Sequence, residues 1–189
     1  MNVSSFRPRL LSSSVLVAAA IAFGSAVPAL ASTVTQTLTP GTLTASIANL
    51  TLGSVPYAHN NQPSTGSMTL TADDSTGTGA GWNVTVVTSS FAYTGANGGT
   101  AIAAANYALT SAAATVTTAG QAYDAVGGPH VPTVSPVGTL DTARKTVQAN
   151  AAFGQGNYTQ ALGVTLTVPA YSRAGTYTGT LTSTVTAAP

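Results

Sequence analysis

In the stretch Tyr177-Thr-Gly-Thr-Leu-Thr-Ser-Thr-Val-Thr-Ala-Ala-Pro189, apolar or small residues alternate with threonines. Side chains on a β-strand point alternately to opposite faces of the sheet. Tyr177, Leu181 and Val185 therefore share one face with Ser183, while the threonines between them line the other. This alternation predicts a strand with one apolar face and one hydroxylated face.

Similar alternation of apolar and polar residues recurs through the rest of the chain. It marks residues 42–47, 68–72, 82–86, 107–109, 147–153 and 164–168. Threonine suits such strands, because its branched Cβ favours extended backbone and its hydroxyl keeps an outer face hydrated. Short alternating segments separated by Gly, Pro and Asn predict an all-β fold, an antiparallel β-sandwich of roughly seven to ten strands.

The N-terminal segment has the features of a signal peptide rather than of a folded element. Arg7 and Arg9 precede an apolar run over residues 10–23, and Ala-Leu-Ala at residues 29–31 forms a small-x-small cleavage site. Ser, Gly and Pro interrupt the apolar run, so it is too short for a stable membrane span. We expect a signal peptide at 1–31, with an uncleaved anchor as the alternative.

The single domain expected to follow, residues 32–189, carries almost no charge. The whole chain has a formal charge of +1, and without the two N-terminal arginines three basic residues face four acidic ones, which gives −1. Nucleic-acid binding requires clustered Lys and Arg to neutralise phosphates, so we expect no nucleic-acid partner. Few lysines remain to protect sheet edges from pairing, which leaves self-association open to this chain.

Catalytic and metal-binding residue types are scarce. The chain has no cysteine, which excludes disulfides and thiolate metal sites, and its two histidines, His59 and His130, lie in loop-like segments without a local catalytic motif. We therefore expect no enzymatic activity and no cofactor. Asp73 and Asp74 are the best metal candidates, since adjacent carboxylates can ligate Ca²⁺. We favour the alternative of a β-turn in which Asp accepts hydrogen bonds from backbone N–H groups.

Two short motifs resemble those of WxL domains, which are non-covalent cell-wall-binding modules of Gram-positive surface proteins. The family's distal motif, Tyr-x-x-x-Leu-Thr-Trp-x-Leu-x-x-x-Pro, is matched in register by Tyr177, Leu181, Thr182 and Pro189. Val185 replaces the second Leu, and Ser183 replaces the Trp. The family's other Trp motif is matched by Gly81-Trp82-Asn83-Val84, again with Val in place of Leu.

The resemblance implies a secreted, non-catalytic surface protein that associates non-covalently with wall glycan, peptidoglycan or other surface proteins. No hydrophobic or basic tail follows the last expected strand, so we expect the folded domain itself to provide the attachment. The implied wall-binding candidates are Trp82, Tyr177, Leu181, Thr182, Ser183 and Val185. The alternative is a structural subunit of a surface coat, fibre or multiprotein complex assembled through strand edges.

The aromatic residues can serve either to bind a ligand or only to complete the fold. Trp82 is either an aromatic platform for a sugar ring or a core residue, because it shares its strand face with Val84 and Val86. Five tyrosines lie near Gly, Pro or Asn, where loop side chains reach solvent, and any two that cluster at one end of the sandwich can stack on a glycan. They are Tyr57, Tyr93, Tyr123, Tyr158 and Tyr171. At Ser183, we hypothesise that local packing has adapted to the loss of an indole.

Overall fold

Strands make up nearly all the regular secondary structure of the protein, whose computed structural model describes residues 32–134 and 136–188. The expected signal peptide at 1–31 and the motif residue Pro189 lie outside the described residues. Residues 32–37 contain no helix or strand. The compact unit that begins at Leu38 holds every strand. Within the described ranges, no helix combines the length and apolarity needed to span a membrane.

The elements follow one another in a simple order along the chain. They are β1 (Leu43–Ile47), β2 (Gln62–Asp74), β3 (Trp82–Thr88), β4 (Ala92–Thr94), a 3-10 turn η1 (Ala104–Asn106), β5 (Tyr107–Ala112), β6 (Val116–Gly120), β7 (Gly138–Thr139), β8 (Arg144–Ala149), β9 (Gly156–Val168), β10 (Thr176–Thr178) and β11 (Leu181–Ala187). The all-β prediction is confirmed. The described residues contain eleven strands, of which β4, β7 and β10 have only two or three residues each.

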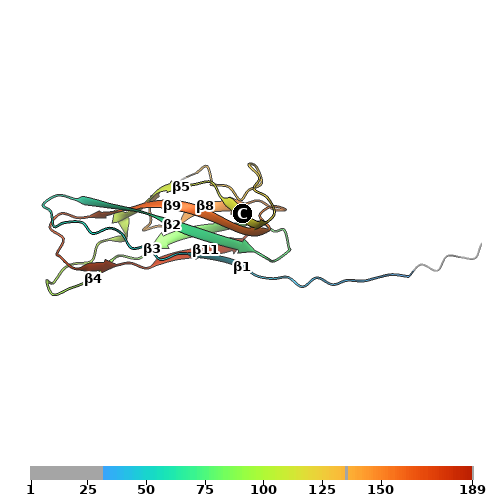
Figure 1. Ribbon diagram of the computed structural model, residues 1–189, viewed down its shortest axis with the longest axis horizontal. Helices are drawn as coiled ribbons and strands as arrows, with labels where there is room; N and C mark the ends of the chain where they lie inside the picture. Colours follow the sequence, from blue (N-terminus) through green and yellow to red (C-terminus); the bar gives the residue numbers. More distant parts are fainter. Residues whose placement is uncertain (1–31, 135, 189) are drawn as a thin grey trace, which may run out of the picture. The chain divides into compact units, whose positions relative to one another are not determined.

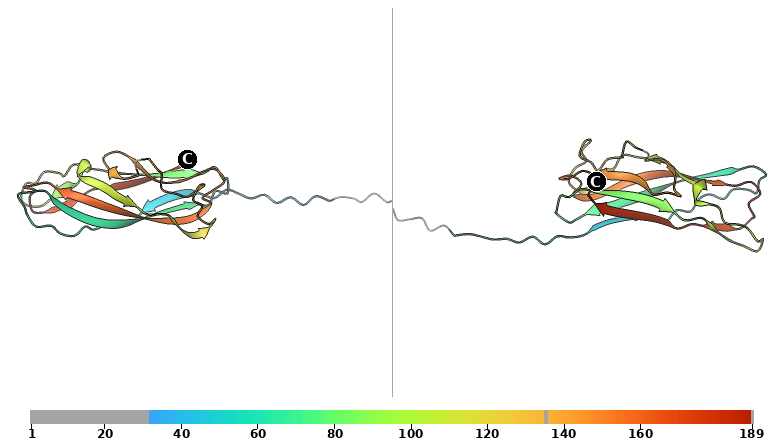
Figure 2. Two further views of the ribbon diagram at one scale, coloured as in Figure 1. Left: turned by 90° about the horizontal axis from the view of Figure 1, so that it is seen from above. Right: turned by 180° about the vertical axis from the view of Figure 1, so that it is seen from behind.

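Two main sheets form the layers of the sandwich (Figures 1 and 2). The larger sheet has the order β1-β2-β9-β5-β7, with β6 pairing to β9, and the smaller one has the order β11-β3-β8. A short ribbon of β10 and β4 extends the structure at one end. Every strand pair is antiparallel. The sandwich predicted from the alternating pattern is therefore confirmed.

The core lies between the inner faces of the two sheets, as the alternation requires. Met68, Leu70 and Ala72 of β2 are all buried, and so are Trp82 and its face partners on β3. The remaining large core residues are Phe91, Ile102, Tyr107, Leu109, Leu140, Val147, Tyr158, Leu162, Val164 and Leu166. Because threonines occupy the intervening positions, the outer faces stay hydrated without charge.

A buried glutamine links the two sheets across this core. Gln160 of β9 is 2% exposed, and its Nε2 donates hydrogen bonds to the carbonyl oxygens of Thr146 at 2.9 Å and Ala113 at 3.0 Å. Thr146 lies on β8 at a register shift opposite Val84 and Thr85, which is a β-bulge. A bulge leaves one residue out of the strand ladder. The Thr146 carbonyl accepts its hydrogen bond from the opposite sheet instead.

Candidate functional site

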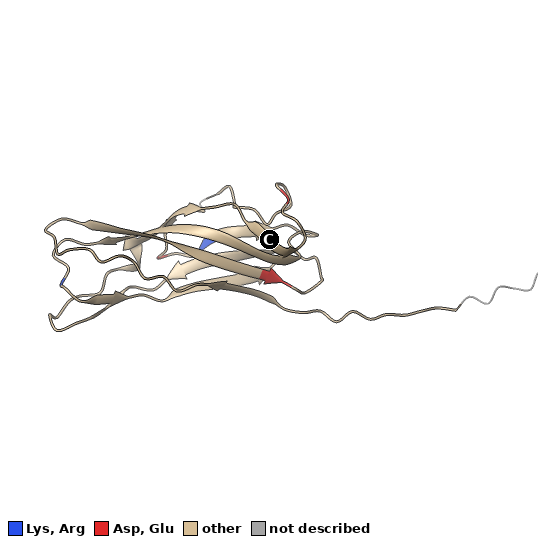
Figure 3. Ribbon diagram, viewed as in Figure 1, with Lys and Arg blue, Asp and Glu red and all other residues tan. Residues whose placement is uncertain are grey.

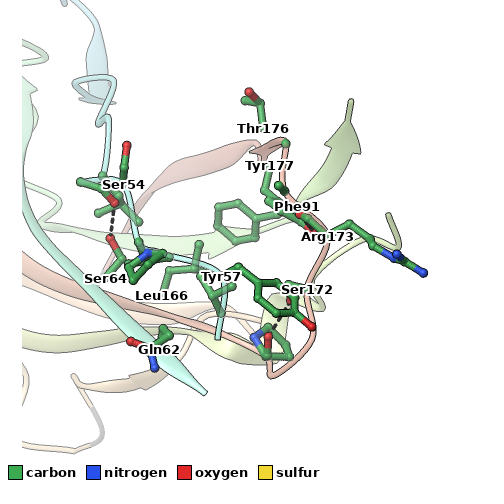
Figure 4. Close-up of a pocket in the computed structure, with 18 of the residues that line it drawn as sticks. Ser54, Tyr57, Gln62, Ser64, Phe91, Leu166, Ser172, Arg173, Thr176 and Tyr177 are labelled. Atoms are coloured by element: carbon green, nitrogen blue, oxygen red, sulfur yellow. Dashed lines mark hydrogen bonds between the residues drawn. The ribbon is translucent and has the colours of Figure 1, made fainter. Parts of the chain in front are cut away.

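A cleft of about 640 Å³ lies at the end of the sandwich where β2 begins and β9 ends. Its two sides are the loop over residues 50–60 and the segment over residues 173–179, and Figure 4 shows Phe91 and Leu166 between them. Gln62 and Val168 are register partners at the ends of β2 and β9. The loop entering β2 and the segment leaving β9 therefore start side by side, which is why they can border one cleft.

The floor of the cleft is apolar and tied firmly to the core. Phe91 is 9% exposed and packs edge-on against Tyr107, with ring centroids 5.2 Å apart. Burial raises the pKa of Tyr107 to about 12, so this phenol is neutral under the floor. The Ser64 hydroxyl donates to the carbonyl of Gly53 at 2.9 Å, and this bond holds the loop against β2. These contacts make the floor a fixed surface.

Three aromatic residues form a continuous cluster beside the cleft, which we call the aromatic rim: Tyr57, His59 and Tyr171. Tyr57 lines the cleft, whereas His59 and Tyr171 do not line it and continue the cluster outward from Tyr57. The His59 ring stacks on Tyr171 at 5.4 Å with an interplanar angle of 22°, and it meets Tyr57 edge-on at 5.5 Å. A backbone hydrogen bond of 3.0 Å from Tyr171 N–H to the Ala58 carbonyl joins the two segments. Tyr57 is 60% exposed and Tyr171 is 64% exposed, so phenol surface remains free for contact.

Of the wall-binding candidates predicted in the distal motif, only Tyr177 lines this cleft. Tyr177 of β10 is half-buried and packs on Tyr93 of β4 with ring centroids 5.3 Å apart. Its hydroxyl donates to the Arg173 carbonyl at 2.8 Å. Leu181, Ser183 and Val185 instead lie half-buried on the inner face of β11, and Thr182 is exposed on the outer face. The structure thus separates the predicted site residues between two places.

Ser183 lies where two sheet edges meet. Its hydroxyl is 3.4 Å from the carbonyl oxygen of Ala45, which belongs to edge strand β1 of the larger sheet. Leu181 and Val185 pack against the core from the same face of β11. A small side chain at position 183 lets β1 approach β11 this closely, which agrees with the hypothesis of adapted packing.

Restoring the family residue with Ser183→Trp is expected to lower the free energy of unfolding by about 1–3 kcal/mol, because an indole must displace β1. Urea unfolding followed by circular dichroism measures the change. The matched control is Thr182→Trp, one position along β11 but on the exposed face. If both variants unfold at the wild-type urea concentration, position 183 has room for an indole and the packing explanation is wrong.

Trp82 belongs to the core, in agreement with the second of its two alternatives. The side chain is 0% exposed, and its Nε1–H donates to the Gly154 carbonyl at 2.9 Å. Gly154 has a φ of +76°, and a Cβ there would lie 2.8 Å from the indole nitrogen. Glycine is therefore required beneath the ring. A fully covered indole offers no face to a sugar in this folded state.

Asp74 accepts a hydrogen bond from a backbone N–H group at the turn after β2, as the favoured alternative predicts, whereas Asp73 accepts a hydrogen bond only from a side-chain hydroxyl. One Asp74 carboxylate oxygen accepts hydrogen bonds from the Thr76 N–H at 3.0 Å and the Thr76 hydroxyl at 2.6 Å. Asp73 accepts a hydrogen bond from the Ser75 hydroxyl at 2.9 Å. Asp124 accepts from the N–H groups of residues 127 and 126, which lower the pKa of its carboxyl. Among residues 32–134 and 136–188, no cluster of three metal-ligating side chains is present.

The five tyrosines predicted to lie in loops have different environments in the structure. Tyr57 and Tyr171 cluster at one end of the sandwich, as the sequence allowed, and Tyr123 is also exposed, at 44%. The placement of Tyr158 in a solvated loop was wrong, because it lies in β9 and is 1% exposed. Tyr93 lies in β4 rather than in a loop. The sequence does not single out His59 as a binding residue. Its position two residues after Tyr57 is the pattern that could have indicated the rim.

The family described as "WxL domain surface cell wall-binding" matches residues 14–189. The chain belongs to the WxL domain family. No curated protein and no solved structure matches it. In this WxL domain the two Trp-motif segments are adjacent strands: β3 and β11 pair antiparallel, with Trp82 opposite Ala187 and Val86 opposite Ser183. The resemblance seen in the two short motifs is confirmed, and it identifies a surface protein that binds the cell wall.

Proposed function

We propose that this protein is exported through the N-terminal signal peptide and retained at the cell wall by its folded WxL domain, without a covalent link and without catalysis. The observation that carries the proposal is a cleft with a single charged lining residue, Arg173, beside an exposed aromatic rim, in a chain of a wall-binding family. Aromatic rings pack well against the apolar C–H faces of sugars and present polar atoms beside them.

The electrostatics of the domain favour a neutral attachment. Charged residues are few and scattered over the structure (Figure 3). Arg173 is the only charged residue lining the cleft within the described ranges, and its guanidinium extends outward from its loop (Figure 4). Interactions between exposed charges are screened by salt, whereas stacking and neutral hydrogen bonds are screened little. The predicted complex is therefore one that salt does not dissociate.

The non-covalent character is tested by co-sedimentation of the purified protein with isolated bacterial cell walls. We expect the folded protein to pellet with the walls and to return to the supernatant when urea unfolds it. Urea leaves covalent bonds intact, so complete release identifies attachment by the folded surface. Protein that stays in the pellet in urea would mean a covalent link, and folded protein that never pellets would contradict wall binding.

A structural role is the second candidate, and the sheet edges support it. Within the described residues, β1 forms a ladder only with β2 and β11 only with β3, and the two edges touch each other where the Ser183 hydroxyl donates to the Ala45 carbonyl. Their exposed positions, such as Thr44 and Thr184, carry no charge that would repel another strand. Size-exclusion chromatography separates the two functions, because a subunit of a coat or fibre elutes as large assemblies without cell walls. A monomer that binds walls favours retention by the cleft.

A further inference from the structure

Tyr171 combines two features that do not stabilise the fold. Its φ is +61°, in the left-handed region that residues with a side chain rarely adopt. Its ring is also 64% exposed, so little apolar surface is buried in return. Glycine would adopt this backbone conformation without strain. Strained conformations with exposed side chains concentrate at functional sites, where the side chain is needed for contact rather than for folding.

The contacts around Tyr171 hold the ring in a defined place. Its N–H donates to the Ala58 carbonyl at 3.0 Å, and the next residue, Ser172, donates through its hydroxyl to the Pro169 carbonyl at 2.7 Å. The stacked His59 ring supports one face of Tyr171 at 5.4 Å. A ring fixed before binding loses less conformational freedom when a ligand arrives. The aromatic rim is therefore a pre-organised platform.

We propose that the cleft and its aromatic rim bind an uncharged stretch of glycan chain, with sugar rings stacked on Tyr57 and Tyr171; this inference rests on the proposed wall binding and assigns its site. Neighbouring sugars extend from the rim over the apolar floor of Phe91 and Leu166. Ser54, Gln62 and Thr176 line the same cleft and supply hydroxyl and amide groups for sugar hydroxyl and acetamido groups.

The lining of the cleft argues for this ligand class over charged alternatives. An anionic polymer would need several cations aimed at it, whereas Arg173 points away from the floor in Figure 4. Sugars present flat apolar faces bordered by hydroxyl groups, and the site presents exposed phenol rings bordered by neutral polar groups. The two surfaces are complementary in polarity without any charge.

The test uses a neutral tetramer of N-acetylglucosamine as the probe, with binding measured by isothermal titration calorimetry. Wild-type protein is expected to bind it, and Tyr57→Ala is expected to weaken binding about tenfold, the loss of one aromatic contact. Tyr57→Phe keeps the ring and is expected to bind within about twofold of wild type. Tyr123→Ala, which removes an exposed tyrosine that belongs neither to the cleft lining nor to the aromatic rim, is the matched control and is expected to change nothing.

Tyr171→Gly separates binding from folding. Because glycine removes the strain at φ +61°, we expect an unfolding midpoint at or above that of wild type together with about tenfold weaker binding. Unchanged affinity in both Tyr57→Ala and Tyr171→Gly would overturn the site. So would wild-type protein that ignores the tetramer but binds polyglycerol phosphate or a free wall peptide, and in that result the proposed wall retention still stands. Wild-type protein that fails to pellet with whole walls would instead contradict the proposed function.

Discussion

Replacing Trp82 with alanine is expected to lower the free energy of unfolding by about 3–5 kcal/mol, enough to consume a large part of the stability of a domain this size. The indole is 0% exposed between the sheets, so its removal loses apolar burial and leaves a cavity. It also leaves the Gly154 carbonyl without the hydrogen bond that Nε1–H donates at 2.9 Å. The lost burial and the lost hydrogen bond both lower the free energy of unfolding.

Urea unfolding followed by circular dichroism measures this loss, because Trp82 is the only tryptophan and its fluorescence vanishes in the variant. Trp82→Phe is expected to recover part of the stability by refilling the cavity without the hydrogen bond. Val126→Ala, at a position that is 81% exposed, is the control and should stay within about 0.5 kcal/mol of wild type. A loss below about 1 kcal/mol in Trp82→Ala would mean that the ring is not a core residue.

Gln160→Glu is expected to lower the stability of the folded protein strongly, and the size of this loss is expected to depend on pH. The substitution keeps the shape but places a carboxyl group, at a position 2% exposed, against the carbonyls of Ala113 and Thr146. Burial and nearby carbonyl oxygens disfavour the charged form, so the pKa of the introduced carboxyl rises in the folded state. For a fully buried carboxyl group the loss at pH 7 is about 4 kcal/mol.

Proton linkage gives the direction in which the stability of this variant changes with pH. An unfolded chain releases the glutamate proton near pH 4.3, at about the ordinary pKa, whereas the folded state keeps it to higher pH. Stability therefore falls as pH rises from about 4 toward neutral, and it returns on acidification, when the protonated carboxyl can again donate one hydrogen bond. Urea midpoints from pH 4 to pH 8 measure this, with exposed Gln36→Glu as the control. A Gln160→Glu variant that follows the wild-type pH curve would refute the buried inter-sheet contact.

Local alternation predicted the sandwich and the faces of most of its strands. The strand predicted over residues 147–153 was wrong beyond Ala149, where β8 ends and the chain turns. The period-two pattern over residues 68–72 and 82–86 assigned both inner faces correctly, because burial on one side of a sheet leaves a direct signature in the sequence. The same reasoning correctly offered the core as the place of Trp82. It failed for Tyr158, because nearby Gly and Asn suggested a loop where β9 runs for thirteen residues.

The candidate site could be predicted only in part, because it depends on contacts between distant segments. Tyr57 and Tyr171 come together since β2 and β9 pair with Gln62 opposite Val168, and no local pattern specifies that register. The partner of Gln160 is a bulged carbonyl on β8, which has no sequence signature of its own. The neighbour of Ser183, strand β1, belongs to the other sheet, so this contact is visible only in the fold.

Salt dependence of wall binding tests most directly whether a neutral, pre-formed surface retains this protein. The dissociation constant for isolated walls is measured by co-sedimentation from about 0.05 M to about 1 M NaCl, a range over which the screening length falls several-fold. Stacking on Tyr57 and Tyr171 and neutral hydrogen bonds predict a change of no more than about twofold. A loss of affinity of about a hundredfold or more, as for proteins that neutralise phosphates, would contradict attachment through this nearly uncharged cleft.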